Sequence, residues 1–342
     1  MSVLEFTDRG IYCPQAGVYL DPWKPVDKAI VTHGHSDHAY AGHQHYLCTT
    51  DAMPVIRHRL YLQGNIQTLP YGEILQINGV NISFHPAGHI PGSAQIRVEY
   101  KGEVWVFSGD YKLQHDGIST PFEPVPCHVF ITESTFGLPI YKWKSQAEVF
   151  DDINAWWRKN RQEGKTSVIT GYTLGKSQRI LKNVDPSIGR IFTHGAVDAV
   201  NSVMREQGIA LPEAPRVSDQ TPKEDLKGAL IISPPSAVGS PWVRRFLPYS
   251  LGVASGWMKL RGTRRRRGAD RGFSLSDHAD WNDLNTAVRE TGAQKVFVTH
   301  GYSEIFAHWL NTQGIEAYEV KTKFEGELGE MAEGGVSVGS EE

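Results

Sequence analysis

Residues Thr32–His38 read THGHSDH, and this stretch decides how the rest of the sequence is interpreted. Three imidazoles and one carboxylate fall within six residues, with no apolar side chain between them. These side chain types bind first-row metals. A polar loop whose histidines only bond to the backbone is the alternative, but the spacing favours a metal site.

The apolar run Lys28–Thr32 predicts a strand that ends at His33. In an extended segment His33 and His35 point the same way, because successive side chains alternate between faces. A bend at the intervening glycine would send Asp37 and His38 in another direction. This geometry suits two adjacent metals, one on each pair of side chains.

The composition is that of an ordinary soluble protein. The chain has 342 residues, 40% hydrophobic and 21% charged, which is enough for one large or two ordinary domains. A net charge of -3 gives no overall attraction to nucleic acid or membrane, so any polyanion site must be a local patch.

Cysteines and termini bear on the compartment. Cys13, Cys48 and Cys127 lie far apart and form no CxxC pair, so we expect reduced thiols rather than a disulfide framework. No basic leader followed by an apolar stretch is evident, and no apolar run reaches the length of a membrane span. We therefore expect a cytoplasmic protein without a membrane partner, with a solvated tail from Glu325.

The pattern of an apolar strand followed by a ligand-type side chain occurs five times. The strands are 28–32, 80–84, 104–107, 129–132 and 296–299, and the side chains that follow them are His33, His89, Asp110, Glu133 and His300. Strand ends converging along one rim of a sheet are where α/β folds place their sites. We therefore expect these side chains to share one cleft.

The segment from about 141 to 268 has a different character. Residues 144–163 have a helical apolar stripe, and 168–170, 189–192 and 229–232 are predicted strands separated by helical patterns. This alternation is typical of a small parallel α/β domain. Because His300 returns to the first set of strands, that domain is expected to be an insertion.

The motifs, taken in chain order, resemble those of a known superfamily. The spacing His33-x-His35-x-Asp37-His38, followed by His89 and Asp110, is similar to that of the metallo-β-lactamase superfamily. Further matches resemble its β-CASP branch of nucleic-acid nucleases: Glu133 in ESTFG, His278 in FSLSDHAD, His300 in VTHG, and the insert segments 171–178 and 254–258.

The resemblance implies an α/β fold, the metallo-β-lactamase αββα sandwich with an inserted β-CASP domain. The implied divisions are 1–140 for the first part of the metallo-β-lactamase domain, 141–268 for the insert, and 269–342 for the remainder with its tail.

The resemblance also implies roles for the site residues. The first of two divalent metal ions would be held by His33, His35 and His89, the second by Asp37, His38 and His300, with Asp110 bridging them. His278 would be the general acid and Glu133 would hold its ring, so that the implied catalytic residues are Asp37, Asp110, Glu133 and His278. Asp27 matches the supporting aspartate, although from the residues alone it either orients a ligand or caps a turn.

The donor set itself indicates the chemistry. Nitrogen and oxygen ligands without a thiolate suit zinc, or alternatively manganese. Two such cations, about 3.5–4 Å apart, activate water and neutralise charge on a phosphodiester. A protonated His278 could then supply the proton that the leaving oxygen requires.

An arginine run precedes His278. Six arginines fall within eleven residues: Arg261, Arg264, Arg265, Arg266, Arg267 and Arg271. They form either a solvated loop or a clamp on a phosphate backbone, and in a chain of net charge -3 their position favours the clamp.

Two other motifs are excluded from the site. The segment Gly175-Lys176-Ser177 lacks the second glycine of a P-loop, because Thr170 stands five positions before Gly175. Thr193-His194-Gly195 imitates the segment around His300, but it lies inside the insert.

Three functions are compared. A small-molecule metallo-hydrolase would not need the insert, the Glu133 and His278 pair or the arginines, and a binding module would tolerate lost ligands. A nuclease uses all of these features. A histidine at position 300 resembles RNA-processing members, related to messenger RNA 3′-end processing factors.

The compact insert and the segment 257–262 instead resemble bacterial ligase-associated DNA exonucleases. We therefore expect a single-strand DNA exonuclease in DNA repair, functionally associated with an ATP-dependent DNA ligase and helicase. RNA is the alternative substrate.

Overall fold

The structure is a computed structural model that describes residues 2–62, 64, 66–260 and 268–324. These residues divide into two compact units. The first unit contains the residues up to Lys142 and those from Asp277 onwards, and the second contains Trp143–Ser276. Each unit has its own sheets and core.

The first unit contains a six-stranded sheet. Its strands follow the chain order: β1 (Glu5–Phe6), β2 (Ile11–Cys13), β3 (Val18–Leu20), β4 (Lys28–Ile30), β5 (His45–Thr49) and β6 (Ile66–Leu69). Strands β3, β4, β5 and β6 run parallel to one another, whereas β2 is antiparallel to both β1 and β3. The parallel strands direct the carboxyl end of β4 to one edge of the sheet.

A seven-stranded sheet completes the first unit. Its spatial order is β18 (Glu316–Glu319), β17 (Lys295–Gly301), β11 (Val129–Ser134), β10 (Glu103–Phe107), β9 (Ala94–Tyr100), β8 (Val80–Pro86) and β7 (Ile74–Ile77). Strands β18, β17, β11 and β10 are parallel, and β9 is antiparallel to both of its neighbours. The ends of β8, β10, β11 and β17 therefore meet at the same edge.

The two sheets pack face to face around an apolar core. Ile30 and Leu47 from the first sheet, with Phe84, Ile96 and Phe107 from the second, belong to one buried cluster. Such burial stabilises the fold by about 1.5–3 kcal/mol for each large apolar side chain.

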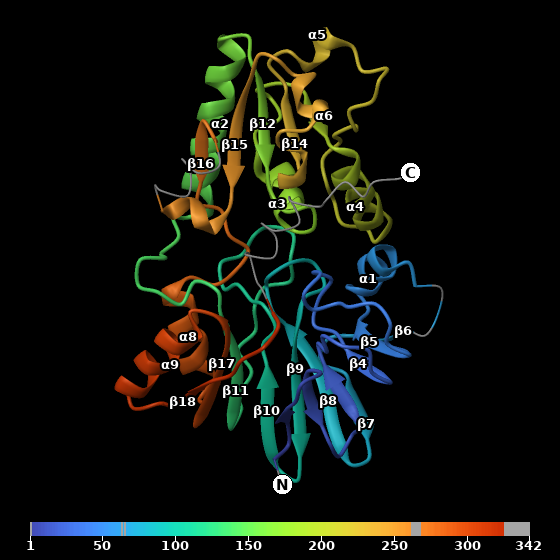
Figure 1. Ribbon diagram of the computed structural model, residues 1–342, viewed down its shortest axis with the longest axis vertical. Helices are drawn as coiled ribbons and strands as arrows, with labels where there is room; N and C mark the ends of the chain where they lie inside the picture. The colour runs from blue at the N-terminus through green and yellow to red at the C-terminus, as the bar shows by residue number, and fades with distance from the viewer. Residues whose placement is uncertain (1, 63, 65, 261–267, 325–342) are drawn as a thin grey trace, which may run out of the picture. The chain divides into compact units, whose positions relative to one another are not determined.

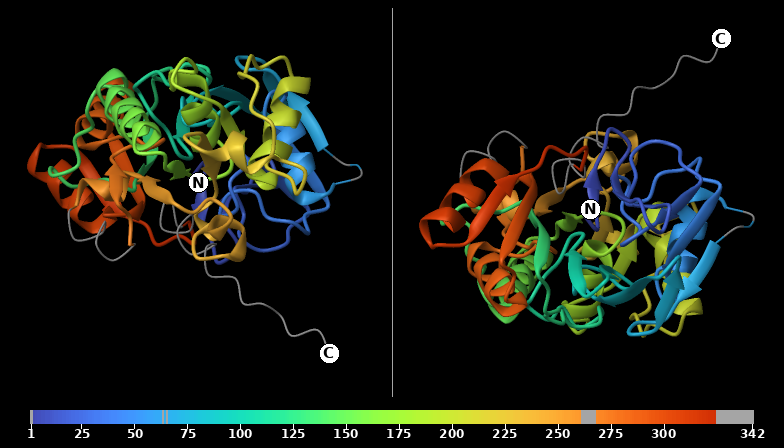
Figure 2. Two further views of the ribbon diagram at one scale, coloured as in Figure 1. Left: turned by 90° about the horizontal axis from the view of Figure 1, so that it is seen from above. Right: turned by 90° about the horizontal axis from the view of Figure 1, so that it is seen from below.

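Helices cover the outer face of each sheet. The helix α1 (Met53–Leu60) contributes Ile56 to the cluster over the first sheet. Helices α8 (Trp281–Thr291) and α9 (Ser303–Thr312) contribute Leu284 and Phe306 to the cluster over the second. Figure 1 and both views of Figure 2 show α8 and α9, in orange and red, on one side of this unit and α1, in blue, on the other. The first unit is an αββα sandwich, as expected.

The single rim predicted from the sequence is in fact formed by two sheets. Strand β4 belongs to the six-stranded sheet, whereas β8, β10, β11 and β17 belong to the seven-stranded sheet. Because parallel pairing in each sheet brings its strand ends to one edge, packing the sheets together brings both sets of ends into proximity.

The second unit is built on a fully parallel five-stranded sheet. Its spatial order is β13 (Ile191–Thr193), β14 (Leu230–Ser233), β12 (Thr166–Thr170), β15 (Tyr249–Ala254) and β16 (Arg271–Phe273). All four pairings are parallel. Its helices are α2 (Gln146–Gln162), α3 (Lys176–Asn183), α4 (Gly195–Glu206), α5 (Lys223–Leu226) and α6 (Pro241–Arg244), with short 3-10 turns η1 (Pro235–Ala237) and η2 (Gly256–Lys259).

Helix α2 shows why this unit begins where it does. Ser145 caps its N-terminus and forms a reciprocal capping box with Glu148, which satisfies two backbone donors of the first turn. Val149, Ile153 and Trp157 form its buried stripe. The stripe has the helical spacing on which the prediction of a helix at 144–163 rested.

The chain returns to the first unit later than the expected division at 268/269. Strand β16 pairs with Gly252–Ala254 of β15, so its residues complete the sheet of the second unit. The two units divide after Ser276. No helix in the described part of the chain is both long and apolar enough to cross a membrane.

Candidate metal centre

The centre is built first on the segment that follows β4. His33 is fully buried, and the Thr32 backbone amide donates to Asp21 Oδ1 over 2.8 Å. The Thr32 hydroxyl donates to Asp21 Oδ2 and lies 3.0 Å from His33 Nδ1. Because the hydroxyl hydrogen is used on Asp21, its oxygen accepts from His33 Nδ1, which leaves the His33 Nε2 lone pair for a ligand.

Asp21 also fixes His38. Its Oδ2 lies 2.7 Å from His38 Nδ1, and both side chains are fully buried. A carboxylate accepts, so Nδ1 carries a proton and Nε2 is the ring atom that can bind a metal. The Asp37 carboxylate lies 3.7 Å from His38 Nε2, and the Phe324 ring stacks on the His38 ring at 4.5 Å.

His89 and His35 converge from separate segments. His89 Nδ1 donates to the backbone carbonyl of Asp277 over 2.8 Å, so Nε2 is its acceptor atom. That Nε2 lies 3.0 Å from His35 Nδ1. Two nitrogens on one zinc at about 2.0–2.1 Å in tetrahedral geometry are separated by roughly 3.3 Å, so the two rings are close enough to share an ion.

Asp110 lies at the centre of the cluster. It follows β10 after Gly109, where a Cβ would be 2.9 Å from Thr32, so only glycine permits this close approach. Asp110 Oδ2 lies 3.6 Å from His33 Nε2, 3.4 Å from His38 Nε2 and 3.8 Å from His89 Nε2.

His300 reaches Asp110 from β17. Its Nε2 lies 3.1 Å from Asp110 Oδ1, and its Nδ1 lies 3.2 Å from the Thr299 hydroxyl, which donates to the Thr132 carbonyl. Gly301 follows with φ of 85°, and a Cβ there would be 2.3 Å from the Ser134 carbonyl oxygen. This glycine lets β17 end tightly against β11.

The arrangement fits two cations. The ligand atoms of His33, His35, His89 and Asp110 lie within 4.8 Å of one another, as do those of His38, Asp110 and His300. The Nε2 atoms of His33, His38 and His300 and both Asp110 oxygens are buried and form no hydrogen bond of ordinary geometry with any described residue. Buried polar atoms without partners are costly, and two cations shared through Asp110 would satisfy them.

Burial and neighbouring charges shift the ionisation of these groups. Burial, then the nearby His38, lowers the pKa of His33 well below its usual value, and burial with His278 lowers the pKa of His89 to about 3. Both imidazoles are therefore neutral at pH 7, the form that binds metal.

The pKa values of His38 and Asp110, whose side chains face each other, shift in opposite directions. Burial alone would lower the pKa of His38, but Asp110 and Asp37 raise it well above its usual value. Burial alone would raise the pKa of Asp110, but His38 and His278 lower it well below its usual range. Asp110 is thus an anion held among imidazoles, as a bridging ligand requires.

A second pair lies beside the metal ligands. His278 is fully buried, with Nδ1 2.9 Å from Glu133 Oε2 and 4.0 Å from Asp110 Oδ2. Glu133 is held in turn by the Tyr111 backbone amide at 2.8 Å and the Thr135 hydroxyl at 2.6 Å. The carboxylate fixes the orientation of the ring.

The structure brings most of the predicted site residues together. Those that meet are His33, His35, Asp37, His38, His89, Asp110, Glu133, His278 and His300. Arg261, Arg264, Arg265, Arg266 and Arg267 lie outside the described residues. Arg271 lies in β16, with its guanidinium 3.9 Å from Asp152.

The structure does not place Asp27 at the centre. Its side chain is 61% exposed, 3.8 Å from His45 Nε2 at the opposite end of β4. Asp21 holds the ligand histidines instead. It ends the run Val18–Leu20, so the strand-end rule that found the other ligands would also have found it, whereas no local signal distinguishes Phe324.

Three known proteins are similar to this chain in sequence. A protein of Opitutus terrae named "Probable DNA ligase" is 33% identical over 324 residues, which cover 94% of this chain and 31% of that protein. A protein of Thermus thermophilus named a ribonuclease is 26% identical over 204 residues, covering 52% and 45%. Cleavage and polyadenylation specificity factor 73 of Drosophila melanogaster is 29% identical over 122 residues, covering 35% and 18%.

The chain thus spans less than half of the length of each of these relatives. No family model matches the sequence. A crystal structure of a protein of unknown function from Enterococcus faecalis superposes with a TM-score of 0.61 at 10% identity, covering 87% of this chain and 80% of that one. This last similarity concerns the fold alone.

The αββα sandwich and its centre of histidines and aspartates define a protein of the metallo-β-lactamase type. The chain belongs, more narrowly, to the β-CASP branch of the metallo-β-lactamase superfamily.

Proposed function

We propose that the protein is a metal-dependent nuclease that hydrolyses single-stranded DNA from an end, in DNA repair, with two zinc ions as cofactors and manganese as the alternative. The observation that carries this proposal is the convergence of two ligand sets on Asp110 with the His278 and Glu133 pair beside them. When bound, the two cations would polarise the scissile phosphodiester and an attacking water.

The chain's own residues would supply the remaining steps. Because Nδ1 of His278 donates to Glu133, a protonated ring would carry its second proton on Nε2 and donate it from there to the leaving oxygen. Asp110 would bridge the two ligand sets, since its Oδ2 faces His33 and His89 of one set and His38 of the other, and its Oδ1 faces His300. Asp21 and the Asp277 carbonyl keep His38 and His89 in the tautomers that bind metal.

The relatives support a nucleic-acid substrate but differ in which one. The Opitutus protein, named "Probable DNA ligase", contains a region similar to this chain, which supports DNA as the substrate and association with a DNA ligase. A role in repair and a helicase partner are further parts of the proposal. Other relatives are named ribonucleases. RNA is therefore the second candidate substrate, favoured by the histidine at position 300.

The proposed arginine clamp would contribute to strand binding. Four consecutive arginines, 264–267, neutralise several phosphates without reading sequence. Replacing them with glutamine should weaken binding and flatten its salt dependence. An unchanged slope of affinity against salt concentration would remove the clamp from the proposal.

The experiment that tests the function uses metal-stripped protein refilled with zinc or manganese. Matched end-labelled single strands of DNA and RNA are offered, with Asp110→Ala as the inactive control. Shortening of DNA with RNA spared supports the repair exonuclease, and the position of the label gives the polarity. Cleavage of RNA alone would establish the second candidate, and equal cutting of a closed circle would rule out dependence on an end.

A further inference from the structure

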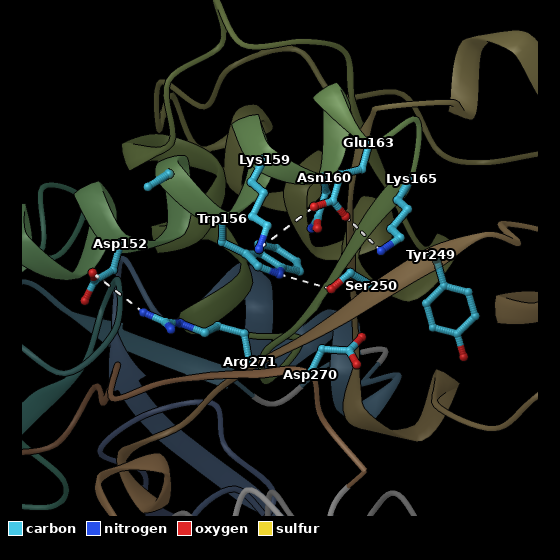
Figure 3. A pocket seen from close by; sticks show the side chains of 11 residues that line it. Asp152, Trp156, Lys159, Asn160, Glu163, Lys165, Tyr249, Ser250, Asp270 and Arg271 are labelled. Carbon is cyan, nitrogen blue, oxygen red and sulfur yellow. Dashed lines mark hydrogen bonds and ion pairs between the residues drawn. The ribbon is translucent and has the colours of Figure 1, made fainter.

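A pocket in the second unit takes no part in the proposed chemistry. It has a volume of about 520 Å³ and lies between helix α2 and strands β15 and β16 (Figure 3). Trp156, Lys159, Lys165, Ser250 and Arg271 are among its lining residues, and we call it the Trp156 pocket. The volume is within the range of ligand sites, about 300–1,000 Å³.

The pocket lies at the amino ends of the parallel strands. Lys165 precedes β12, Tyr249 opens β15, and Arg271 opens β16. Ligands of open α/β sheets usually bind outside the carboxyl ends of the strands. This pocket is therefore additional to any site at the other end of the sheet.

Trp156 is a rigid platform within this pocket. Its Nε1 donates to the Ser250 hydroxyl over 3.1 Å, and its ring packs edge-on against Phe273 at 5.5 Å. A Cβ on Gly252 would be 3.0 Å from the ring, so glycine there lets the ring lie close against β15. The indole is half-buried with its polar edge already bonded, so it offers a ligand its π face.

Cations surround this platform. The side chains of Lys159, Lys165 and Arg271 are 74%, 43% and 48% exposed, and all three line the pocket with Trp156. An aromatic face among cations is the combination that binds single-stranded nucleic acid, with the base on the ring and the phosphates on the cations.

The carboxylates of the pocket already have partners. Asp152 is 3.0 Å from Lys144, Glu163 is 2.8 Å from Lys165, and Asp270 accepts from the Leu251 amide over 2.8 Å. Three carboxylates balance the three cations, so the pocket has no large net charge. Stacking would therefore contribute more to affinity than phosphate contacts, and the affinity would depend weakly on salt.

We propose that the Trp156 pocket binds one nucleotide of a single strand, with its base stacked on Trp156 and its phosphates near Lys159, Lys165 and Arg271. The inference rests on the proposed function, because the strand would be the substrate of the nuclease. It adds a holding site whose residues include none of the predicted metal ligands and, of the arginine run, only Arg271.

The test measures binding without cleavage. A fluorescent single strand is titrated into metal-stripped protein and followed by anisotropy. Trp156→Ala should weaken binding by about tenfold, the effect of losing one base–aromatic stack, while Trp156→Phe should retain most of the affinity. The matched controls are Trp242→Ala, a half-buried tryptophan outside the pocket, and Lys223→Gln, an exposed lysine of α5; both should bind normally.

Two further measurements keep the test decisive if Trp156→Ala does not fold. The double variant Lys159→Gln with Lys165→Gln should weaken binding about two- to fivefold and reduce the salt slope by less than about two. A photoreactive strand should cross-link to the peptide that contains Trp156. Unchanged affinity in the folded variants, or cross-links only elsewhere, would overturn the inference.

The design separates this inference from the proposed nuclease. If refilled wild-type protein cleaves no nucleic acid but the pocket variants still lose binding, the proposed function fails and the pocket stands. If wild type cleaves, and the variants bind and cleave a long strand as wild type does, the pocket fails and the function stands.

Discussion

The tripeptide Thr-His-Gly occurs three times in this chain, and its copies have different environments. Two copies, at His33 and His300, lie just after β4 and at the end of β17 in the first unit, and their Nε2 atoms lie 3.6 and 3.1 Å from Asp110. The third, at His194, follows β13 of the second unit and caps helix α4. In all three places a strand thus leads into the same sequence, Thr-His-Gly.

The copies differ in the hydrogen bond that the histidine Nδ1 makes. In His33 and His300 this atom lies 3.0 and 3.2 Å from the hydroxyl of the preceding threonine, which has already donated its hydrogen elsewhere. In His194 the same atom accepts from the Ala196 amide over 3.1 Å. His194 therefore carries its proton on Nε2, the tautomer opposite to that of a ligand bound through Nε2. The comparison shows that the partner of the ring, rather than the motif, decides whether a histidine is available to a metal.

The largest expected effect comes from replacing the histidine of one copy in the first unit and, in parallel, the histidine of the copy in the second unit. His300→Ala should remove a ligand of one cation and lower activity by about a thousandfold or more, because both cations contribute to neutralising the transition state. His194→Ala should leave metal content and activity unchanged and cost about 1 kcal/mol of stability through loss of the helix cap. Metal analysis, cleavage rates and thermal unfolding of both variants give the result. Equal metal loss in both would refute the distinction.

His278 sharpens the comparison within the first unit, because its Nδ1 is bonded to a carboxylate as that of His38 is, yet the predicted role of His278 is that of a general acid and not of a ligand. His278→Ala should keep both cations yet lower turnover by about a hundredfold or more, the usual contribution of a general acid. Glu133→Gln should have a smaller effect in the same direction. Turnover measured with metal content tests this, and loss of metal in His278→Ala would mean that it is a ligand.

Asp21 and Asp27 provide a matched pair of aspartates near β4. Asp21→Asn weakens the partner of both His38 and Thr32 and should lower metal affinity by about 10–100-fold. Asp27→Asn, on the exposed side chain at the other end of the strand, should have no effect. Competition with a metal-binding dye measures both affinities. If Asp27→Asn were the weaker binder, the assignment of the supporting aspartate would revert to the sequence-based one.

The smallest expected effect concerns Asp283, a carboxyl group that has another carboxylate as its neighbour. Asp110 lies among imidazoles, whereas Asp283 lies near Asp280, and burial together with that charge raises the pKa of Asp283 to about 6. A raised carboxyl pKa means that the folded state holds a proton longer than the unfolded state. Stability is therefore lost as pH rises from about 4 to about 6 and stays lower above that range.

Asp283→Asn should abolish this part of the pH dependence. The variant should gain about 1–2 kcal/mol at pH 8 and little at pH 4. Denaturant unfolding at the two pH values measures the difference. A variant that is destabilised equally at both would show that the charge of Asp283 is not the cause.

The strand-end rule predicted much of the centre from the sequence. It placed His33, His89, Asp110, Glu133 and His300 together because each follows a local apolar run whose pairing direction is readily inferred. It missed the division of those runs between two sheets, since period-two patterning does not say which sheet a strand joins.

The choice of supporting residues required the fold. Asp27 was the expected supporting aspartate because it adjoins the strand in sequence and matches the family pattern, yet Asp21 reaches His38 and Thr32 through pairing of β3 with β4. The Trp156 pocket was not predicted at all, because its walls come from α2, β15 and β16, which are separated by about a hundred residues of chain. Contacts of that sequence separation leave no local pattern.

The position of β17 in the sheet also constrains the order of biosynthesis. It pairs with β11, made more than a hundred residues earlier, and it carries His300, whereas His33, His89, Asp110 and Glu133 all precede the second unit. A nascent chain on the ribosome therefore contains most of the predicted ligands long before β17 can pair with β11. The final strand pairing, rather than the supply of ligands, determines when the mature centre can exist.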